Sequence, residues 1–434
     1  GQEMKIGIQN IYNTWKIMYG TMMKIKLIMF WAFILACIAC SDETAPQPVP
    51  DGGGQLRIAY KIAGVSMSRA EGDEDNTEPG WDGDWNENTI TRVDLFVFNT
   101  GNTLLRHLDS DDLTTTIEKD NEGYTVAETQ GLTYAEATKD KTYYMIANCP
   151  QLENATINTL SDLQAIMITP DLVFNAKQTE GFVMDDKGEL VTPTDGGTTS
   201  TLTFDLERAA AKIRLTVLAK DKTTNVTSQC SFRLYNYVTQ KAWVLAREEA
   251  TASDGTSLTA EEVNAFYDLA TNETDDILRQ SMSALTPYNS DDLLKSDDNK
   301  VVFYSYPNDW FDESKAYLGT DGNWTIDDYT TTNPIIRDNQ TYIQLEAPYD
   351  EVNYYYEVPV NLSTYENNDA LSFSADEYKE IRNLYRLQRN HIYDITVTID
   401  RKGGTVSEPV TLTNLAYEVK DWKGEINIEV PSFD

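Results

Sequence analysis

Short runs in which apolar and polar residues alternate recur along this chain, and they constrain its fold more than any other feature. The first run is Leu56–Ile62, where Leu56, Ile58, Tyr60 and Ile62 alternate with Arg57, Ala59 and Lys61. A period of two turns one face of a β-strand toward a core and the other toward solvent. Because similar runs recur between Gly-, Asn- and Asp-rich turns, the sequence predicts an all-β chain built from β-sandwiches.

Most of the other predicted elements are short strands. They are expected at Arg92–Phe98, Thr142–Asn148, Ser231–Val238, Val301–Tyr306, Gln340–Glu346, Asn353–Val360, Tyr393–Ile399, Thr405–Leu412 and Glu425–Val430, and Thr199–Leu218 is expected to be a long β-rich segment. Short helices are expected near Leu160–Ile168 and Ala260–Leu269, and Ser231–Val238 is expected to pair with Thr199–Leu218. The sequence shows no repeat of roughly 20–50 residues, which disfavours solenoids and propellers.

Composition along the chain suggests two domains. A Gly- and Thr-rich patch, Asp195–Thr199, precedes the long β-rich run and favours a boundary near residue 210. Residues 55–210 and 211–434 are therefore predicted to be tandem Greek-key β-sandwich domains with a few short helices, since domains typically contain about 100–200 residues. Residues 41–54 are rich in Pro, Gly and acidic side chains, and we expect them to form a tether.

The N-terminal stretch indicates export. The apolar run Leu27–Ala39 follows two lysines and is shorter than the about 20 residues that a membrane-spanning helix needs. Because the run ends at Cys40, it resembles a bacterial lipoprotein signal, in which the chain is cut before a cysteine whose thiol is then acylated. Cys37 is a competing site, and Cys40 is preferred because an acidic Ser-Asp-Glu follows it, as in surface-export tags of Bacteroidetes lipoproteins. Residues 1–40 are predicted to be a stretch upstream of Met22 followed by this signal peptide, and they are not expected to belong to the folded body.

The charge of the chain excludes several classes of partner. Its 35 basic and 70 acidic residues give a formal net charge of −35. A phosphate backbone would be repelled by this charge, so nucleic acid is not expected as a partner. The same charge opposes electrostatic attachment to anionic lipid, which leaves an acyl chain as the expected link to a membrane.

Few residues suit catalysis or metal binding. The chain contains only two histidines, His107 and His391, so a dense His/Cys metal site cannot form. After the signal the only cysteines are Cys149 and Cys230, which are favoured as two buried thiols over a disulfide. There is no phosphate-binding loop, nucleophile elbow or HExxH motif, and the acid-rich loops lack EF-hand spacing. We expect no enzymatic activity, no metal and no cofactor.

Several short patterns together resemble the Bacteroidetes fimbrillin family of FimA-like pilus subunits. After the lipoprotein signal they are, in order, Val93–Phe98, Tyr144–Asn148, Glu207–Ile213, Arg389–Tyr393 and Asp421-Trp422. The resemblance implies transthyretin-like β-sandwich domains and export as an outer-membrane lipoprotein. It also implies cleavage after an arginine and polymerisation by strand exchange into an extracellular fimbria that supports adhesion.

The N-terminal end of the folded body fits such processing. The acidic stretch Glu71–Asn88 shows no periodicity and is expected to be an exposed loop that follows Arg69 and Ala70. Cleavage between these two residues would release the anchor together with the first strand, which carries Leu56, Ile58, Tyr60 and Ile62. The groove left behind would expose unpaired backbone groups, a template for strand addition. Other arginines lie nearby at Arg57 and Arg92, so the cleavage site is not unique.

The C-terminal end offers a candidate donor strand. Ile426, Ile428 and Val430 alternate with polar residues and could fill the groove of a neighbouring subunit. Donor and acceptor would lie on different surfaces, so the contact is head-to-tail and grows a filament. The alternative that Leu56–Ile62 is simply a permanent first strand stays open. Arg389–His391 is interpreted as a hydrogen-bonding cluster before a strand, not as a catalytic group.

The expected partners follow from this interpretation. They are other fimbrial subunits, a processing protease, the outer membrane before processing, and a host or bacterial surface receptor. A shaft or accessory role is favoured over an anchor or tip role. A different class also stays open, a monomeric surface lipoprotein that binds glycans on exposed aromatic side chains, with Trp81, Trp85 and Trp310 as candidates.

Overall fold

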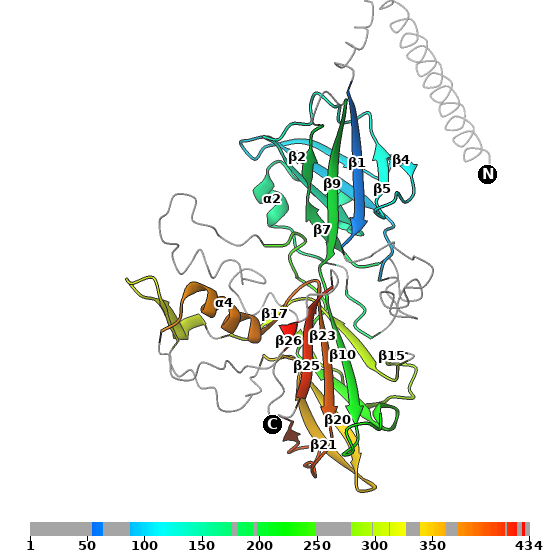
Figure 1. Cartoon of the computed structure of the whole chain (residues 1–434), viewed down its shortest axis with the longest axis vertical. Helices are drawn as coiled ribbons and strands as arrows, with labels where there is room; N and C mark the ends of the chain where they lie inside the picture. The colour runs from blue at the N-terminus through cyan, green and yellow to red at the C-terminus, as the bar shows by residue number, and fades with distance from the viewer. Residues whose placement is uncertain are drawn as a thin grey trace, which may run out of the picture. The chain divides into compact units, whose positions relative to one another are not determined.

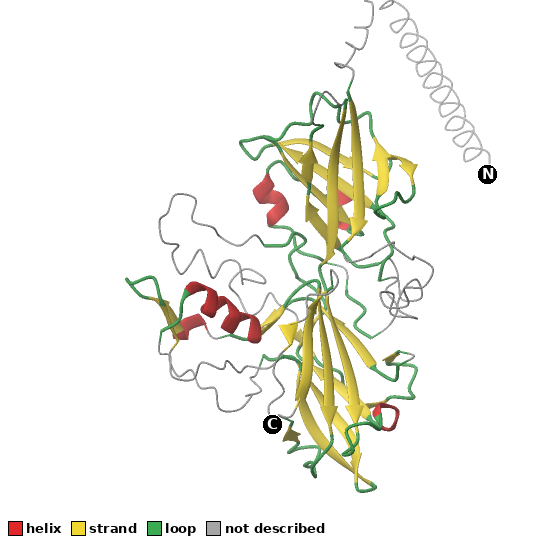
Figure 2. Cartoon of the chain, viewed as in Figure 1, coloured by secondary structure: helices red, strands yellow, loops and turns green. Residues whose placement is uncertain are grey.

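The fold is seen in a computed structural model of the chain. The structure describes residues 54–63, 87–169, 171–175, 181–193, 198–247, 279–296, 298–311, 313–326, 339–361, 372–412, 415–422 and 428–429. Most of these residues lie in strands and loops, with few helices (Figure 2). The predicted all-β class is confirmed.

The first part of the chain forms a nine-stranded sheet within the described residues. Its strands follow the order β3-β2-β6-β7-β9-β1-β5-β4, with β8 paired to β9. They are β1 (Gln55–Ile62), β2 (Val93–Phe98), β3 (Leu104–Asp109), β4 (Thr114–Ile117), β5 (Thr125–Glu128), β6 (Thr142–Ala147), β7 (Met184–Lys187), β8 (Glu189–Val191) and β9 (Thr199–Arg208). The first strand of the chain is therefore an interior strand of this sheet.

The second part forms two larger sheets. One has the order β15-β16-β10-β23-β25-β26 and the other the order β14-β11-β20-β21-β24. The strands of the first are β10 (Ala211–Leu218), β15 (Leu294–Lys295), β16 (Val301–Ser305), β23 (His391–Thr398), β25 (Leu415–Asp421) and β26 (Ile428–Glu429). Those of the second are β11 (Ser231–Tyr235), β14 (Thr286–Pro287), β20 (Tyr342–Tyr349), β21 (Val352–Pro359) and β24 (Val410–Thr411). Short two-stranded pairs join β12 (Tyr237–Val238) to β13 (Arg279–Gln280), β17 (Asn308–Asp309) to β22 (Arg386–Leu387), and β18 (Ala316–Leu318) to β19 (Trp324–Ile326).

The apolar residues gather in two clusters. In β9 the side chains alternate strictly, so that Leu202, Phe204 and Leu206 are buried between half-buried or exposed neighbours. These residues belong to the first cluster, whereas the second holds side chains from both sheets of the second part, such as Ile213 and Leu345. Two sheets with a shared apolar interior form a β-sandwich, the arrangement that a period of two predicts.

Helices are few and short. The α-helices are α2 (Leu160–Gln164) and α4 (Ala375–Leu384), and the 3₁₀ turns are η1 (Pro150–Asn154), η2 (Thr227–Gln229) and η3 (Glu313–Lys315). The predicted helix near Leu160–Ile168 is confirmed as α2, while α4 is missing from the sequence prediction. A capping box begins α4, because the Ser374 side chain accepts from the Glu377 N–H and the Glu377 carboxylate accepts from Ser374. Ala260–Leu269, the other predicted helix, lies outside the described residues.

One prediction about strand pairing is wrong. Ser231–Val238 does not pair with Thr199–Leu218, because its β11 part pairs with β14 and β20 instead. The predicted β-rich segment Thr199–Leu218 forms two strands, since the chain leaves the first sheet after Arg208 and enters the next at Ala211. In addition, only Val410–Thr411 of the predicted strand Thr405–Leu412 is paired.

The division into domains stays a prediction. Contacts group Gln55–Asp434 as one compact unit. The break between the first sheet and the next falls at Ala209 and Ala210, beside the predicted boundary, but Tyr304 and Trp422 from the second part belong to the first apolar cluster. Among the described residues, no helix is both long and apolar enough to span a membrane.

Candidate functional site

The first strand occupies an interior slot of its sheet. All eight residues of β1 run parallel to β9, in register from Gln55 opposite Thr199 to Ile62 opposite Leu206. On its other side β1 pairs antiparallel with β5, where Ile58 faces Ala127. Figure 1 shows β1 and β9 side by side along their length, with β5 on the far side of β1. Removing β1 would therefore uncover two strand edges at once.

The apolar side chains of β1 are anchored in the first cluster. Leu56, Ile58 and Ile62 are buried, while Tyr60 is half-buried and packs against the same cluster. Burial raises the pKa of the Tyr60 hydroxyl above its usual value. Ala59 is also buried, although the alternation places it on the polar face, because a small side chain is easily covered when a strand has neighbours on both sides.

The polar face of β1 makes weaker contacts. Lys61 Nζ lies 3.8 Å from Asp205 Oδ1 and 4.0 Å from the centroid of the Tyr124 ring. At the start of the strand, Gln55 Nε2 donates to Glu128 Oε1 at 2.5 Å. An exposed ion pair such as that of Lys61 with Asp205 contributes about 0–1 kcal/mol to the free energy of unfolding. The stability of the strand in its slot therefore comes from its apolar side chains and backbone hydrogen bonds.

The segments predicted to be processed lie beyond the described residues. Cys40, Arg69 and Ala70 are all outside them. The description of the chain stops at Ala63, just after β1, and resumes at Glu87. The residues that flank the predicted cleavage loop are thus described, although the loop itself is not.

Glu87 is held by a buried cluster of polar side chains. Lys212 Nζ lies 3.0 Å from the Glu87 carboxylate, and both side chains are almost fully buried. The Tyr304 hydroxyl donates to the same carboxylate, and Arg208 Nε donates to the Glu87 carbonyl at 3.1 Å. Burial, together with the Glu87 carboxylate, raises the pKa of Tyr304 well above its usual value. A buried carboxylate needs such partners, because leaving it uncompensated costs several kcal/mol.

Trp422 is held by the same three side chains. The Arg208 Cζ atom lies 4.4 Å and the Lys212 Nζ atom 5.5 Å from the Trp422 ring centroid, both in cation–π positions. The Tyr304 ring lies parallel to the Trp422 ring, with centroids 6.2 Å apart. We call Glu87, Arg208, Lys212, Tyr304 and Trp422 the junction cluster. It ties the start of the first described segment after the predicted cleavage loop to the end of β25.

The candidate donor strand is described only in part. Ile428 lies in the short β26, which pairs antiparallel with β25 through Val419 opposite Ile428. Ile426 and Val430 lie outside the described residues. In this structure β26 therefore occupies the edge of its own sheet, next to β25.

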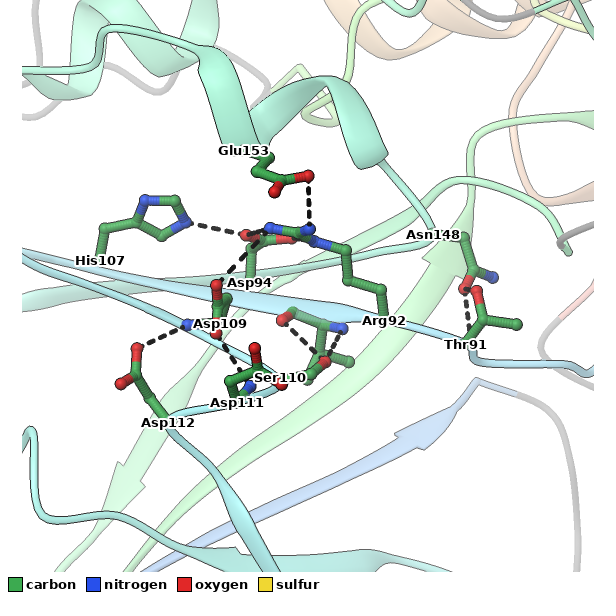
Figure 3. Close-up of polar contacts among 11 residues, drawn as sticks. Thr91, Arg92, Asp94, His107, Asp109, Ser110, Asp111, Asp112, Asn148 and Glu153 are labelled. Atoms are coloured by element: carbon green, nitrogen blue, oxygen red, sulfur yellow. Dashed lines mark hydrogen bonds and ion pairs between the residues drawn. The ribbon is translucent and has the colours of Figure 1, made fainter. Parts of the chain in front are cut away.

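Figure 3 shows a second polar cluster, which joins β2, β3 and η1. Arg92 donates two hydrogen bonds to Asp94, from Nε to Oδ2 at 2.8 Å and from Nη2 to Oδ1 at 2.9 Å. His107 Nε2 lies 2.8 Å from Asp94 Oδ1, and Arg92 Nη1 lies 3.5 Å from Glu153 Oε2. Burial raises the pKa of Asp94, but the hydrogen bonds from Arg92 and His107 outweigh it and leave that pKa below its usual value. These contacts hold β2, β3 and η1 together.

The other motif residues, Asn148, Arg389 and His391, also make hydrogen bonds that join separate segments of the chain. Asn148 accepts from the Thr91 N–H at 2.8 Å and donates to the Phe182 carbonyl at 2.9 Å. Arg389 donates to Asp185, and His391 Nδ1 lies 2.7 Å from the Arg389 carbonyl, with its Nε2 3.0 Å from Asp421. The interpretation of Arg389–His391 as a hydrogen-bonding cluster agrees with these contacts.

The remaining candidates from the sequence are largely buried. Cys149 and Cys230 are free, buried thiols in different apolar clusters, as favoured. Trp310 is buried and offers no sugar platform, whereas Trp81 and Trp85 lie outside the described residues. Within the described ranges, no group of three or more His, Cys, Asp or Glu side chains could hold a metal ion.

Sequence reasoning missed the junction cluster. Glu87 was assigned to an exposed acidic loop, yet it is 3 % exposed, which corrects that assignment at its C-terminal end. A signal was present in β10, where Lys212 and Arg214 interrupt an otherwise apolar run, Ala211–Leu218. Cations in a fully buried strand require buried acids. These acids are Glu87 for Lys212 and Asp394 for Arg214.

Comparison with known proteins relates part of the chain to a known family. Residues 55–256 match the family model described as major fimbrial subunit protein (FimA). A comparison with curated proteins finds no match.

Similar folds occur among solved structures. The tip fimbrial protein Mfa3 from Porphyromonas gingivalis is 15% identical, with 85% of this chain and 99% of that chain covered at a TM-score of 0.41. A fimbrial assembly protein from Parabacteroides distasonis is 12% identical, with 87% and 98% covered at a TM-score of 0.40. Because these identities and TM-scores are low, the assignment rests on the family model. The fimbrillin resemblance is thereby confirmed for residues 55–256, which match the FimA family of major fimbrial subunits.

Proposed function

We propose that this chain is a polymerising fimbrial subunit that is exported as a lipoprotein acylated at Cys40. It is then cleaved between Arg69 and Ala70 and assembled by donor-strand exchange at the cell surface. The observation that supports this proposal best is the position of β1, an interior strand between β9 and β5 whose C-terminal end leads directly into the predicted cleavage loop. A subunit without β1 would expose the edges of both neighbours and the apolar pockets of Leu56, Ile58 and Ile62.

Cleavage alone would not free the strand. Burial of Leu56, Ile58 and Ile62 contributes about 1.5–3 kcal/mol for each side chain, before the backbone hydrogen bonds are counted. Cutting the loop does, however, turn an intramolecular strand into a separate peptide, which loses the effective concentration of the covalent link. A second strand held close by a neighbouring subunit can then displace it. The cut thus makes exchange possible, and the incoming donor drives it.

The C-terminal segment with Ile426, Ile428 and Val430 is the proposed donor. In the described residues β26 pairs with β25 at just two positions, Glu418 with Glu429 and Val419 with Ile428, whereas β1 pairs with β9 at eight positions and with β5 at three. Because the pairing of β26 is so short, few backbone hydrogen bonds would break when the segment moves to the longer β1 position in the sheet of a neighbouring subunit. The contact is head-to-tail, so it extends a filament. This supports a shaft or accessory role.

Limited digestion with an arginine-specific protease tests the proposal. The chain from Ser41 to Asp434, which contains the compact unit, is digested, sequenced from its N-terminus and run on a gel without boiling. We expect a new terminus at Ala70 and a ladder of SDS-resistant oligomers. Arg69→Lys should prevent the cut and the ladder, whereas the matched control Arg401→Gln, at an exposed arginine, should change neither. A chain that is cut at Arg69 and stays monomeric would contradict polymerisation by exchange.

A further inference from the structure

His391 joins the start of β23 to the end of β25. Its Cα pairs with that of Asp421 across these two strands, which Figure 1 shows side by side. The His391 Nε2 atom lies 3.0 Å from Asp421 Oδ1, and its Nδ1 atom lies 2.7 Å from the Arg389 carbonyl oxygen. One residue further along, the Trp422 N–H donates to the Asn390 carbonyl at 2.6 Å. We call the two contacts of the imidazole ring the His391 bridge.

Both ring nitrogens of His391 face oxygen atoms that can only accept a hydrogen bond. A backbone carbonyl has no hydrogen to donate, and an ionised carboxylate has none either. The hydrogen bond from His391 lowers the pKa of Asp421, so this carboxylate is ionised at every pH above about 4. Because a neutral imidazole carries hydrogen on only one nitrogen, only the protonated ring can donate to both oxygens.

The other histidine of the chain differs in this respect. The sequence contains only His107 and His391. The His107 Nε2 atom lies 2.8 Å from Asp94 Oδ1, and a neutral ring with its hydrogen on Nε2 satisfies this contact. The contacts of His391 therefore require a charged ring, whereas this contact of His107 does not.

The charged groups around His391 have opposing effects on its protonation. Those that line the same cavity are Lys241, Arg247, Arg386, Arg389 and Glu207. Four of them are cations, and nearby cations disfavour a protonated imidazole. This effect is reduced at Arg389, which donates to the buried Asp185, and on the neighbouring strand β10 at Lys212, which is paired with Glu87. Asp421 is the acid at hydrogen-bond distance from the ring, so its charge is what favours the second proton.

We infer that the His391 bridge is a pH-sensitive connection that holds the C-terminal end of β25 against β23. An imidazole ordinarily changes its charge between about pH 5 and pH 8. At the acid end of this range the ring is protonated and Asp421 is ionised, so both contacts form. At the upper end the ring is neutral, one of its nitrogens faces an oxygen without a hydrogen between them, and that contact is lost. The end of β25 should therefore open more often at the higher pH.

This connection lies next to the proposed donor segment. Beyond Trp422 the chain leads to Ile428 in β26, the described part of that segment. More frequent opening at the end of β25 would release the segment more readily, so strand exchange should be faster at about pH 8 than at about pH 5. This consequence rests on the proposed function, whereas the pH-sensitive bridge itself does not.

Amide hydrogen exchange in the uncleaved chain from Ser41 to Asp434 tests the inference. Mass spectrometry follows exchange in peptides that cover β25 at pH 5.5 and at pH 8, and each rate is divided by the intrinsic rate at that pH. We expect the corrected rate to rise about three- to tenfold between the two pH values, because one hydrogen bond to a charged group is lost. Peptides that cover β9 should show no such rise.

Two variants remove the bridge in different ways, so the test stays decisive if one of them fails to fold. His391→Gln has no titrating ring, and its corrected rate should be the same at both pH values. Asp421→Asn should give the same result, because a neutral amide can donate to or accept from either form of the ring. His107→Gln is the matched control and should keep the full rise.

An equal corrected rate at both pH values in the natural chain would overturn the inference. A rise that persists in both His391→Gln and Asp421→Asn would also overturn it. A pH-dependent rate in a chain that is cut but forms no ladder would leave this inference standing and contradict the proposed function. A ladder without any pH-dependent rate would overturn this inference alone.

Discussion

Glu87 and Trp422 are held by the same side chain, Lys212, although they lie near opposite ends of the folded sequence. The Lys212 ammonium forms a 3.0 Å ion pair with the Glu87 carboxylate and lies 5.5 Å from the centroid of the Trp422 ring. One of these residues follows the proposed cleavage loop, and the other precedes the proposed donor segment. The proposed cleavage loop therefore ends, and the proposed donor segment begins, at a common buried anchor.

Lys212 is expected to be essential for stability. Lys212→Met removes the partner of a buried carboxylate, so we expect the free energy of unfolding to fall by about 3–5 kcal/mol. Urea denaturation measures this value. Adding Glu87→Gln to the same chain should recover part of the loss, since no buried charge then lacks its partner. Lys139→Met is the matched control at an exposed lysine, and a loss below about 1 kcal/mol in Lys212→Met itself would contradict the account.

Asp94 should make stability depend on pH in the acid range. Its pKa is lower in the folded chain than in the unfolded chain, because Arg92 and His107 donate to the carboxylate. Its contribution is therefore present above the unfolded pKa of about 3.9 and is lost as the pH falls through the folded pKa. Asp94→Asn should lower the free energy of unfolding by about 2 kcal/mol at pH 7.

The gap between Asp94→Asn and the natural chain should narrow steadily below pH 4. Unfolding curves of both chains between pH 7 and pH 2 check this. A gap that stays constant over this range would show that the loss comes from shape or packing and not from the carboxylate charge. Asp291→Asn, at an exposed aspartate, is the control.

The two thiols of the folded body should be unreactive. Burial raises the pKa of Cys149 and of Cys230 to about 12 in each case, so few thiolates exist at pH 8. In the chain from Ser41 to Asp434, iodoacetamide should label neither cysteine until denaturant is added, and both afterwards. Mass spectrometry of the labelled protein counts the adducts. Rapid labelling of either thiol in the native protein would contradict its buried position.

The first strand should be stabilised by its apolar face and not by its polar face. Ile58 is fully buried, so Ile58→Ala is expected to cost about 2–5 kcal/mol. Lys61→Gln removes a surface ion pair with Asp205 and should cost less than about 1 kcal/mol. Urea denaturation of the uncleaved chain measures both. Equal losses in the two variants would contradict the importance of the apolar pockets.

Local patterns predicted the strands better than their pairing. The alternation in Leu56–Ile62 correctly predicts a strand with a buried apolar face, because that pattern depends on neighbours in sequence. The partner of Ser231–Val238 could not be predicted, since β20 lies far along the chain and no local feature identifies it. The break of Thr199–Leu218 also depends on packing, because Arg208 ends one sheet at the junction cluster.

The candidate site was predicted only in part, because its long-range contacts leave no local pattern in the sequence. The first strand shows a period of two and could be recognised from sequence alone, whereas only Ile428–Glu429 of the predicted strand Glu425–Val430 are described. Glu87 is one of many acids in an aperiodic stretch, and only its contact with Lys212 distinguishes it.

The most direct measurement of the central claim is the fate of the fragment Ser41–Arg69 after cleavage. Oligomers and monomers are separated by gel filtration under native conditions and analysed by mass spectrometry. Strand exchange predicts that the oligomers lack this fragment, and that a chain truncated before Gly424 stays monomeric and retains it. Oligomers that still contain the fragment in equal amounts with the subunit would contradict exchange at the β1 slot.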